Sequence, residues 1–351
     1  MNTSITIPFL EELYPKIKED KLFGKWVTLS DVEPLIQSLN KELFQVELLG
    51  TSEEDRNIYK LKLGTGTKKI MIWSQMHGNE STGTKALFDL FKFLDVYPEH
   101  EIVSSILNNC EITIIPMLNP DGSLAYTRVN SKNVDLNRDA VDLEACESKL
   151  LRNTLDVFNP KFCFNLHDQR TIFGVEGTQN PATISFLAPS EEESRALTSG
   201  RKETMNVIIA MNNLLQQVIP NHIGRYTDEF YPTATGDNFQ KLGHNTILIE
   251  AGHYPNDYNR EEVRKFNFYS LLEGLHYIAN NNDFSDYEAY FDIPNNNKLF
   301  FDVIHRYKNR KDEAYQYEDK IIDNQFVSTL QKRQEGELND HKGHNEIVFE
   351  Y

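Results

Sequence analysis

The sequence predicts an α/β protein with a mixed, mostly parallel central sheet covered by helices on both faces, followed by a small, partly β C-terminal appendage. Short apolar runs rich in β-branched residues alternate with longer segments of helical spacing. Such runs are typical of strands buried on both faces, and their alternation with helices is typical of an α/β sheet. After about residue 280 the composition becomes asparagine-rich and charged. We therefore expect a main domain over residues 1–280 and an appendage over residues 281–351.

The predicted elements follow one another along the main domain in a regular order. Residues 8 to 40 have helical spacing, and the strand-like runs FQVELLG and NIYKLKLG come next. The remaining strands and helices are expected at these ranges: strand 69–75, helix 81–94, strand 111–118, helix 143–158, strand 161–166, helix 191–218, strand 245–250 and helix 260–278. In the appendage, KLFFDVIHRY is strand-like, whereas HKGH at 341–344 has no predicted strand before it and is expected to be solvated.

Composition and charge argue against several functions. The 351 residues carry 36 lysines and arginines against 53 acids, and this net charge of −17 disfavours binding to nucleic acids and to anionic membranes. No apolar run of membrane-spanning length occurs, and the N-terminus lacks the pattern of a signal peptide. Three scattered cysteines fit a reducing compartment. We expect a cytoplasmic protein, and the sequence does not indicate its oligomeric state.

Polar residues follow the predicted strands at the points where the strands end. His77 and Glu80 lie in the string MHGNE after one strand, His167 follows another, and Glu250 ends a third. In open α/β sheets, ligands bind outside the carboxyl ends of the strands. We therefore expect these four side chains to lie close together at one edge of the sheet.

Two histidines and a glutamate are a three-ligand set for a catalytic zinc ion that keeps its fourth position for water. Zinc lowers the pKa of such a water to about 7, and a base must then accept its proton. Glu250 has no lysine or arginine beside it in the sequence and suits that task. A single histidine is often a hydrogen-bonded core residue, and a single glutamate is often an ion-pair partner. Their joint placement at strand ends favours the metal site over those interpretations.

Five features in this order resemble the M14 class of zinc carboxypeptidases: HGNE at 77–80, NPDG at 119–122, DLNR at 135–138, the strand-ending His167 and the strand-ending Glu250. The resemblance covers about residues 65–280. It implies that residues 1–280 form the catalytic domain, that His77, Glu80 and His167 bind one zinc ion, and that Glu250 is the general base.

The resemblance also implies roles for further residues. Asn137 and Arg138 are similar to the pair that holds the terminal carboxylate of the substrate, and Arg128 is similar to the arginine that polarises the scissile carbonyl. Asp135 resembles the acid that orients a zinc-bound histidine, which here is expected to be His77. A guanidinium matches a planar carboxylate with two parallel hydrogen bonds, so Arg138 favours an exopeptidase. A permanent cation at Arg128 suits a developing oxyanion, although both arginines could instead form surface ion pairs.

The family usually places a mobile tyrosine before the general base. The string GRYTDEFYPTATGD offers Tyr226 and Tyr231, and spacing alone does not choose between them. We favour Tyr226 as the residue that contacts the substrate.

The sequence therefore predicts a zinc-dependent carboxypeptidase that hydrolyses the C-terminal peptide bond through a zinc-activated water. Two alternatives remain. The related N-acyl amino acid deacylases, aspartoacylase and succinylglutamate desuccinylase, share HGNE-like and DLNR-like strings, so the substrate could be an acylated amino acid. A non-catalytic protein that captures peptide C-termini would keep the same fold, but such proteins typically lose a ligand or the base.

Overall fold

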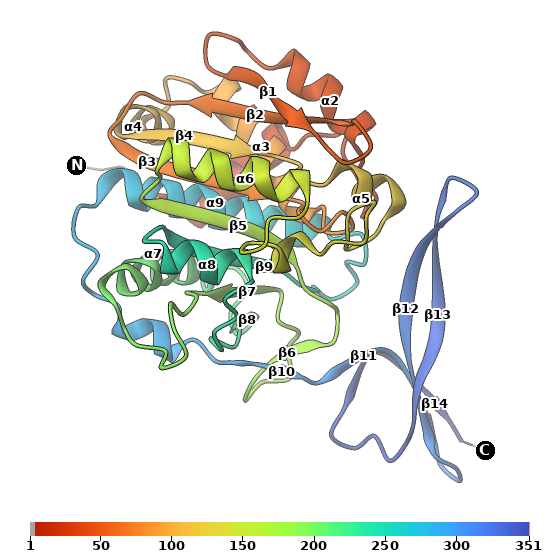
Figure 1. Cartoon of the computed structure of the whole chain (residues 1–351). Coiled ribbons are helices and arrows are strands. Elements are labelled where there is room, and N and C mark those ends of the chain that lie inside the picture. Colours follow the sequence, from red (N-terminus) through yellow and green to blue (C-terminus); the bar gives the residue numbers. More distant parts are fainter. Residues whose placement is uncertain (1–3, 351) are drawn as a thin grey trace.

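The computed structural model describes residues 4–350, and its centre is an eight-stranded sheet in the order β1-β2-β4-β3-β5-β9-β7-β8 (Figure 1). The strands are β1 (Gln45–Thr51), β2 (Asn57–Leu63), β3 (Lys68–Ser74), β4 (Cys110–Ile115), β5 (Phe162–Asp168), β7 (Ile184–Leu187), β8 (Ile223–Arg225) and β9 (Asn245–Ala251). The four middle strands β4, β3, β5 and β9 run parallel, β7 pairs with β8 in parallel, and the other three pairs are antiparallel. The predicted fold class is confirmed.

Helices cover both faces of this sheet (Figure 1). They are α1 (Ile7–Ile17), α2 (Leu29–Ser38), α3 (Thr82–Val96), α4 (Glu101–Asn109), α5 (Pro120–Ala125), α6 (Cys146–Phe158), α7 (Ser199–Leu215), α8 (Thr235–Lys241) and α9 (Glu261–Asn280), with short 3₁₀ turns at Leu136–Arg138 and Glu288–Asp292. Side chains alternate along β3: Ile70 and Ile72 join the larger core with α3, α7 and α9, whereas Met71 and Trp73 join the smaller core with α6. No described helix is long and apolar enough to cross a membrane.

Several element boundaries differ from the prediction. The strand expected at 111–118 already ends at Ile115, and NPDG opens α5, where Asn119 Oδ1 accepts a hydrogen bond from the Gly122 N–H. The helix expected from residue 191 begins at Ser199, and α4 was not predicted. β7, β8 and β6 (Phe173–Val175) have only three or four residues, too few to show a two-residue hydrophobic period.

A buried ion pair joins α3 and α9, two of the long helices on one face of the sheet. Nε and Nη2 of Arg264 in α9 donate hydrogen bonds of 2.7 and 2.6 Å to the two carboxylate oxygens of Asp89 in α3. Both side chains are fully buried. The Tyr14 hydroxyl and the Glu19 N–H also donate to this carboxylate. The pair therefore fixes α1, α3 and α9 relative to one another.

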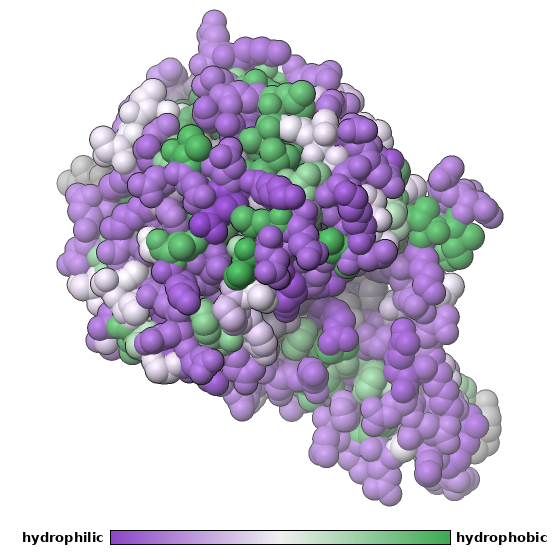
Figure 2. Space-filling model, in the orientation of Figure 1, coloured by the Kyte–Doolittle hydropathy of each residue, from purple (hydrophilic) through white to green (hydrophobic). Residues whose placement is uncertain are grey.

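The C-terminal residues form a second, four-stranded sheet in the order β13-β12-β11-β14, as the expected β appendage (Figure 1). Its strands are β11 (Phe300–Tyr307), β12 (Asp312–Ile322), β13 (Gln325–Gly336) and β14 (Lys342–Phe349), and β10 (Asn296–Lys298) pairs with β6 of the main domain. A small core of its own is formed by Ile304, Ala314 and Leu338, and its visible surface is mostly hydrophilic (Figure 2).

The prediction that HKGH is solvated is wrong for His344. This residue lies in β14, its ring stacks on Phe300 at a centroid distance of 4.5 Å, and its Nε2–H donates to the Thr171 carbonyl. Burial is the main reason why the pKa of His344 is lowered. His344 therefore belongs to the contact between the C-terminal sheet and the main domain.

Candidate active site

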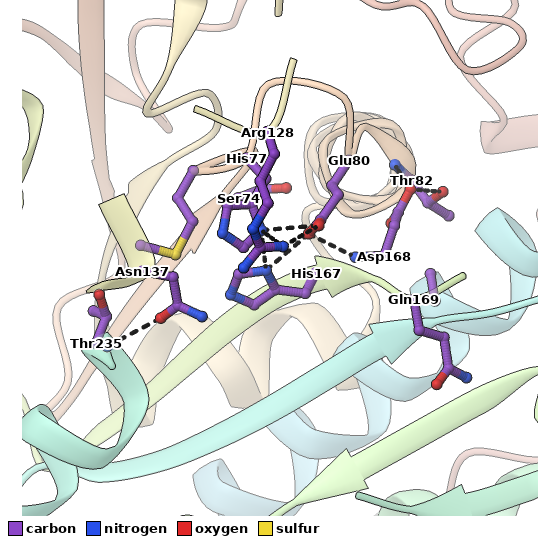
Figure 3. Close-up of polar contacts among 12 residues, drawn as sticks. Ser74, His77, Glu80, Thr82, Arg128, Asn137, His167, Asp168, Gln169 and Thr235 are labelled. Atoms are coloured by element: carbon purple, nitrogen blue, oxygen red, sulfur yellow. Dashed lines mark hydrogen bonds and ion pairs between the residues drawn. The ribbon is translucent and has the colours of Figure 1, made fainter. Parts of the chain in front are cut away.

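Three side chains meet at the carboxyl edge of the central sheet (Figure 3). His77 and Glu80 lie in the loop between β3 and α3, and His167 lies near the end of β5, the strand next to β3. One potential ligand atom from each residue lies within 4.8 Å of the others. We call these three residues the triad.

The triad is compact and buried. His77 Nδ1 lies 2.8 Å from Glu80 Oε1, and His167 Nδ1 lies 2.8 Å from Glu80 Oε2. The two Nδ1 atoms are 3.1 Å apart. His77 and His167 are only 1% and 2% exposed, and Glu80 is 9% exposed. Bulk water therefore does little to screen the charges of these groups from one another.

The loop that carries His77 is fixed by an unusual backbone and by a close contact. Gln75 has a positive φ of 51°, which turns the chain sharply after β3, and its Nε2 donates to the carbonyls of Val27 and Gly78. A Cβ at Gly78 would lie 1.9 Å from the Gly122 backbone, so only glycine fits there. Gly78 therefore allows the HGNE loop to pack directly against the backbone of NPDG at the start of α5.

The charges of the triad depend on one another. Burial opposes the charged form of His77, but Glu80 and Asp135 outweigh burial and raise its pKa. Burial lowers the pKa of His167. Burial also opposes ionisation of Glu80, but the two histidines hold the pKa of this carboxyl well below its usual range. An ionised carboxylate with two imidazoles around it is a donor set that suits a divalent cation.

Glu250 lies beside the triad without joining it. It stands on β9, in register with His167 on the neighbouring parallel strand β5. Burial, together with the charges of Glu80 and Asp168, raises the pKa of Glu250 well above its usual value. Within residues 4–350 its carboxylate forms no hydrogen bond or ion pair, so a proton acceptor is available next to the triad.

Asp135 and Arg128 flank the triad on the side of His77. Asp135 Oδ1 is 3.1 Å from His77 Nε2, the ring nitrogen that faces away from Glu80. Arg128 Nε donates to Asp135 Oδ2 at 2.9 Å, and Arg128 Nη1 lies 3.3 Å from Glu80 Oε1. Burial opposes ionisation of Asp135, but His77 and Arg128 lower the pKa of this carboxyl. Asp135 therefore orients both His77 and Arg128.

The structure does not bring Asn137 and Arg138 into contact with the triad. Asn137 Oδ1 accepts a hydrogen bond from the Thr235 N–H at the start of α8, and Asn137 lies beside the triad in Figure 3. Arg138 is exposed; its Nη1 donates to the Asn137 carbonyl at 2.6 Å, and its guanidinium lies 5.8 Å from the Tyr231 ring centre. The guanidinium therefore remains free to take a second partner from solvent.

The two candidate tyrosines have different surroundings. Tyr226 is half-buried, its ring packs on Phe173, and its pKa is raised by burial and by the charge of Glu250. The exposed Tyr231 donates its hydroxyl hydrogen to Glu229 instead. Of the two, Tyr226 is the one that interacts electrostatically with Glu250.

Sequence reasoning missed Asp168 and the residues around it. Asp168 follows His167 in β5; its N–H donates to Glu80 Oε2, and its own Oδ2 accepts from the Thr82 hydroxyl and lies 3.3 Å from Arg260. The charged string HDQR was the only available signal, because Thr82 and Arg260 are far from it in the sequence. Asp168 therefore positions Glu80 through the backbone and faces a cavity described below.

The triad fits a zinc ion by its chemistry. Zinc prefers imidazole and carboxylate ligands at about 2.0–2.2 Å in tetrahedral geometry, which sets neighbouring ligand atoms roughly 3.3 Å apart. The two Nδ1 atoms and the Glu80 oxygens lie close to that spacing. Asp135 on the other nitrogen of His77 is the kind of partner that zinc-bound histidines usually have.

Comparisons with known proteins agree with the family resemblance that the sequence motifs indicate. The Peptidase_M14 family, described as zinc carboxypeptidase, matches residues 33–222. A probable carboxypeptidase 2 of Arthroderma benhamiae is 28% identical over 192 residues, which are 52% of this chain and 34% of that protein. Carboxypeptidase A2 of Mus musculus is 27% identical over 178 residues, 48% of this chain and 38% of that protein. This chain thus spans little more than a third of the length of these relatives.

Solved structures show the same fold. Carboxypeptidase A from Helicoverpa armigera superposes with a TM-score of 0.57 at 17% identity, over 78% of this chain and 80% of that one. A metallo-carboxypeptidase from Burkholderia cenocepacia superposes with a TM-score of 0.56 at 18% identity, over 70% of this chain and 66% of that one. Since the family match covers more than half of the chain and carries the HGNE, NPDG and DLNR strings, the chain belongs to the M14 family of zinc carboxypeptidases.

Proposed function

We propose that this protein is a zinc-dependent carboxypeptidase that removes the C-terminal residue of a peptide. The observation that carries the proposal is the buried triad of His77, Glu80 and His167 with the unpaired carboxylate of Glu250 on the adjacent strand. Membership of the family supports zinc as the metal.

In this proposal the three residues of the triad hold the zinc ion. When bound, zinc acts as a Lewis acid on the scissile carbonyl and lowers the pKa of a coordinated water. Glu250 accepts the proton of the attacking water, and later gives it to the leaving amine. Asp135 holds His77 in the tautomer that leaves Nδ1 free as a ligand.

The remaining residues bind the substrate. Arg138 carries a guanidinium that is open to solvent and donates a hydrogen bond to the Asn137 carbonyl, so the two residues can receive the terminal carboxylate. Arg128 is held against Glu80 by Asp135, where its positive charge can stabilise the oxyanion. Tyr226, next to Glu250, can close over the bound peptide.

The sharpest test is Glu250→Gln in zinc-loaded protein. This substitution keeps the shape of the side chain and removes the proton acceptor, so we expect hydrolysis of a mixed peptide library to fall by about a thousandfold while zinc remains bound. Mass spectrometry of the digest and metal analysis of the same sample measure both quantities. Glu262→Gln, an exposed acid on α9, is the matched control. Unchanged hydrolysis by the Glu250 variant would show that the assigned mechanism is wrong.

A further inference from the structure

A cavity of about 380 Å³ lies next to the triad, between the main domain and the C-terminal sheet. Glu80 and Arg128 line it on the side of the triad, and Gln316, Tyr317, Glu318 and Asp319 of β12 line it on the opposite side. Asp168, Gln169 and Arg170, which directly follow His167, also line it. The C-terminal sheet therefore forms one wall of the space that opens from the candidate active site.

The β12–β13 hairpin is attached firmly in this position. Lys25 forms an ion pair with Asp319, and both side chains are only 16% exposed. The Phe326 ring on β13 packs edge-on against Tyr126 at 5.0 Å, and Tyr126 lies two residues before Arg128. Tyr317 packs edge-on against Tyr258 at 5.1 Å. These contacts make the hairpin a fixed wall.

Within the cavity, the C-terminal sheet supplies negative charge. Asp302 of β11 and Glu318 and Asp319 of β12 line the cavity, and the sheet adds no lysine or arginine to the lining. The cations come from the main domain. Lys25 pairs with Asp319, and Arg260 pairs with Asp168. Arg128 pairs with both Glu80 and Asp135, whereas Arg170 is exposed.

Asp302 differs from Glu318 and Asp319, the other two acids of the C-terminal sheet in the lining, because it has no cationic partner among the described residues. It is 1% exposed and forms no ion pair within residues 4–350. Its Oδ2 accepts a hydrogen bond of 2.7 Å from the Tyr317 N–H, but its Oδ1 has no partner. The Oδ1 atoms of Asp168 and Asp319 in the same lining also lack a partner. Asp168 and Asp319 each have a cation on the other carboxylate oxygen, whereas Asp302 has none in the described part of the chain. A buried carboxylate without a cation is unfavourable, so Asp302 lacks a positively charged donor.

The position of the cavity indicates which end of a peptide enters it. Figure 3 shows Asn137 and Thr235 on one side of the triad and Asp168 and Gln169 on the other. Asn137 and Arg138 do not line the cavity. If the terminal carboxylate of the substrate lies at Arg138, the amino side of the scissile bond points toward Asp168 and the C-terminal sheet.

We propose that the C-terminal sheet closes the amino side of the substrate site, so that the enzyme acts on short peptides whose free terminal ammonium group binds at Asp302. The cavity volume is near the lower end of the range of about 300–1,000 Å³ that holds small ligands. A dipeptide or tripeptide can fill this space, whereas a longer chain collides with β12. This inference rests on the proposed carboxypeptidase activity and names its substrate class.

The first test compares peptides that share their C-terminal residues. A dipeptide, a tripeptide and a hexapeptide are each supplied with a free or an N-acetylated terminus, and an N-acetyl amino acid is included. We expect kcat/KM for the free tripeptide to exceed that of its acetylated form and that of the hexapeptide by about tenfold or more, the effect of one hydrogen bond to a charged group. If the hexapeptide has the same kcat/KM as the free tripeptide, the C-terminal sheet does not limit peptide length. If the acetylated tripeptide has the same kcat/KM as the free tripeptide, no site binds the terminal ammonium group.

The second test is Asp302→Asn in the full-length, zinc-loaded protein. Asparagine keeps an acceptor for the Tyr317 N–H and removes the negative charge. We expect KM for free tripeptides to rise about tenfold with kcat nearly unchanged, and KM for acetylated peptides to stay constant. Asp323→Asn, at the exposed tip of the same hairpin with a positive φ of 49° that asparagine tolerates, is the matched control.

The outcomes separate this inference from the proposed function. If Glu250→Gln abolishes hydrolysis but peptide length and acetylation have no effect, the carboxypeptidase stands and the closed ammonium site is wrong. If only the N-acetyl amino acid is hydrolysed, the enzyme is a deacylase and both proposals are wrong. If Asp302→Asn raises KM for free and acetylated peptides alike, Asp302 supports the wall and does not bind the ammonium group.

Discussion

The edge of the central sheet and the C-terminal sheet face each other across one cavity, but different forces hold them in place. Strand β3, which leads to His77, runs through the protein core, and Ile70, Ile72 and Trp73 are fully buried. Strand β13 is exposed along most of its length, and the C-terminal sheet has a small core of its own, formed by Ile304, Ala314 and Leu338. The candidate active site therefore depends on the core, whereas the cavity wall depends on a few contacts with the main domain.

This difference suggests how the two regions respond to substitution. Damage beneath the central sheet is expected to affect the stability of the whole main domain, because the larger core with α3, α7 and α9 is one continuous cluster. Damage to the core of the C-terminal sheet is expected to stay local, because that core is separate from the core of the main domain. Substitutions in the two regions test this contrast.

The largest effect is expected from His167→Ala, which removes one side chain of the triad. We expect loss of bound zinc and a fall in kcat/KM of about a thousandfold or more, because the site loses one of its three proposed protein ligands. Metal analysis and hydrolysis assays measure the change. The same substitution in the C-terminal sheet, His305→Ala, should leave zinc binding unchanged; equal metal loss in both variants would refute the assignment.

The second prediction concerns the ion pair beneath the central sheet. Asp89→Asn removes the fully buried charged partner of Arg264 and leaves the longer contact with Glu261 at 3.3 Å, so we expect the free energy of unfolding to fall by about 3–5 kcal/mol. Chemical denaturation followed by circular dichroism measures this change. Asp156→Asn, which breaks the exposed pair with Arg152 on α6, should cost less than about 1 kcal/mol. A similar loss in both variants would contradict the role of burial.

The third prediction concerns the core of the C-terminal sheet. Ile304→Ala removes a fully buried side chain there, and we expect a local loss of about 2–4 kcal/mol. Hydrogen exchange should become faster in β11, β12 and β14, while amides of β3 and β5 keep their protection. Faster exchange throughout the main domain would show that the two regions unfold as a single unit.

The smallest effect is expected from Glu273 on α9. Burial raises the pKa of Glu273 from 4.5 to about 7, so the folded state favours the protonated form. The stability that this group contributes is therefore fully present below about pH 4.5 and is lost as the pH rises through about 7. Glu273→Gln should raise the free energy of unfolding by about 1–3 kcal/mol at pH 8 and change it little near pH 4.5. Thermal unfolding at both pH values measures this, and a stabilisation independent of pH would contradict the explanation.

The fold class and the convergence of the triad could be predicted from sequence for the same reason. Buried parallel strands appear as apolar runs, and the carboxyl ends of such strands meet at one edge of a sheet, so His77, His167 and Glu250 are brought together. Their roles in zinc binding and catalysis stay predictions, as does the cytoplasmic location.

The cavity wall could not be predicted in this way. Its position depends on the side-chain contacts of Phe326 with Tyr126 and of Asp319 with Lys25, pairs that lie about two hundred residues or more apart in the sequence. The packing of His344 against His253 is of the same kind, and it explains why the expectation of a solvated HKGH failed. Such contacts leave no local pattern in the sequence, because each partner alone resembles an ordinary surface residue.

The position of Asp302 and Asp319 late in the sequence has a consequence for biosynthesis. A ribosome makes the chain from its N-terminus, so His77, Glu80, His167 and Glu250 are all translated before β11 and β12. The nascent main domain can therefore assemble its proposed metal ligands while the proposed amino side of the substrate site still lies open to the surroundings.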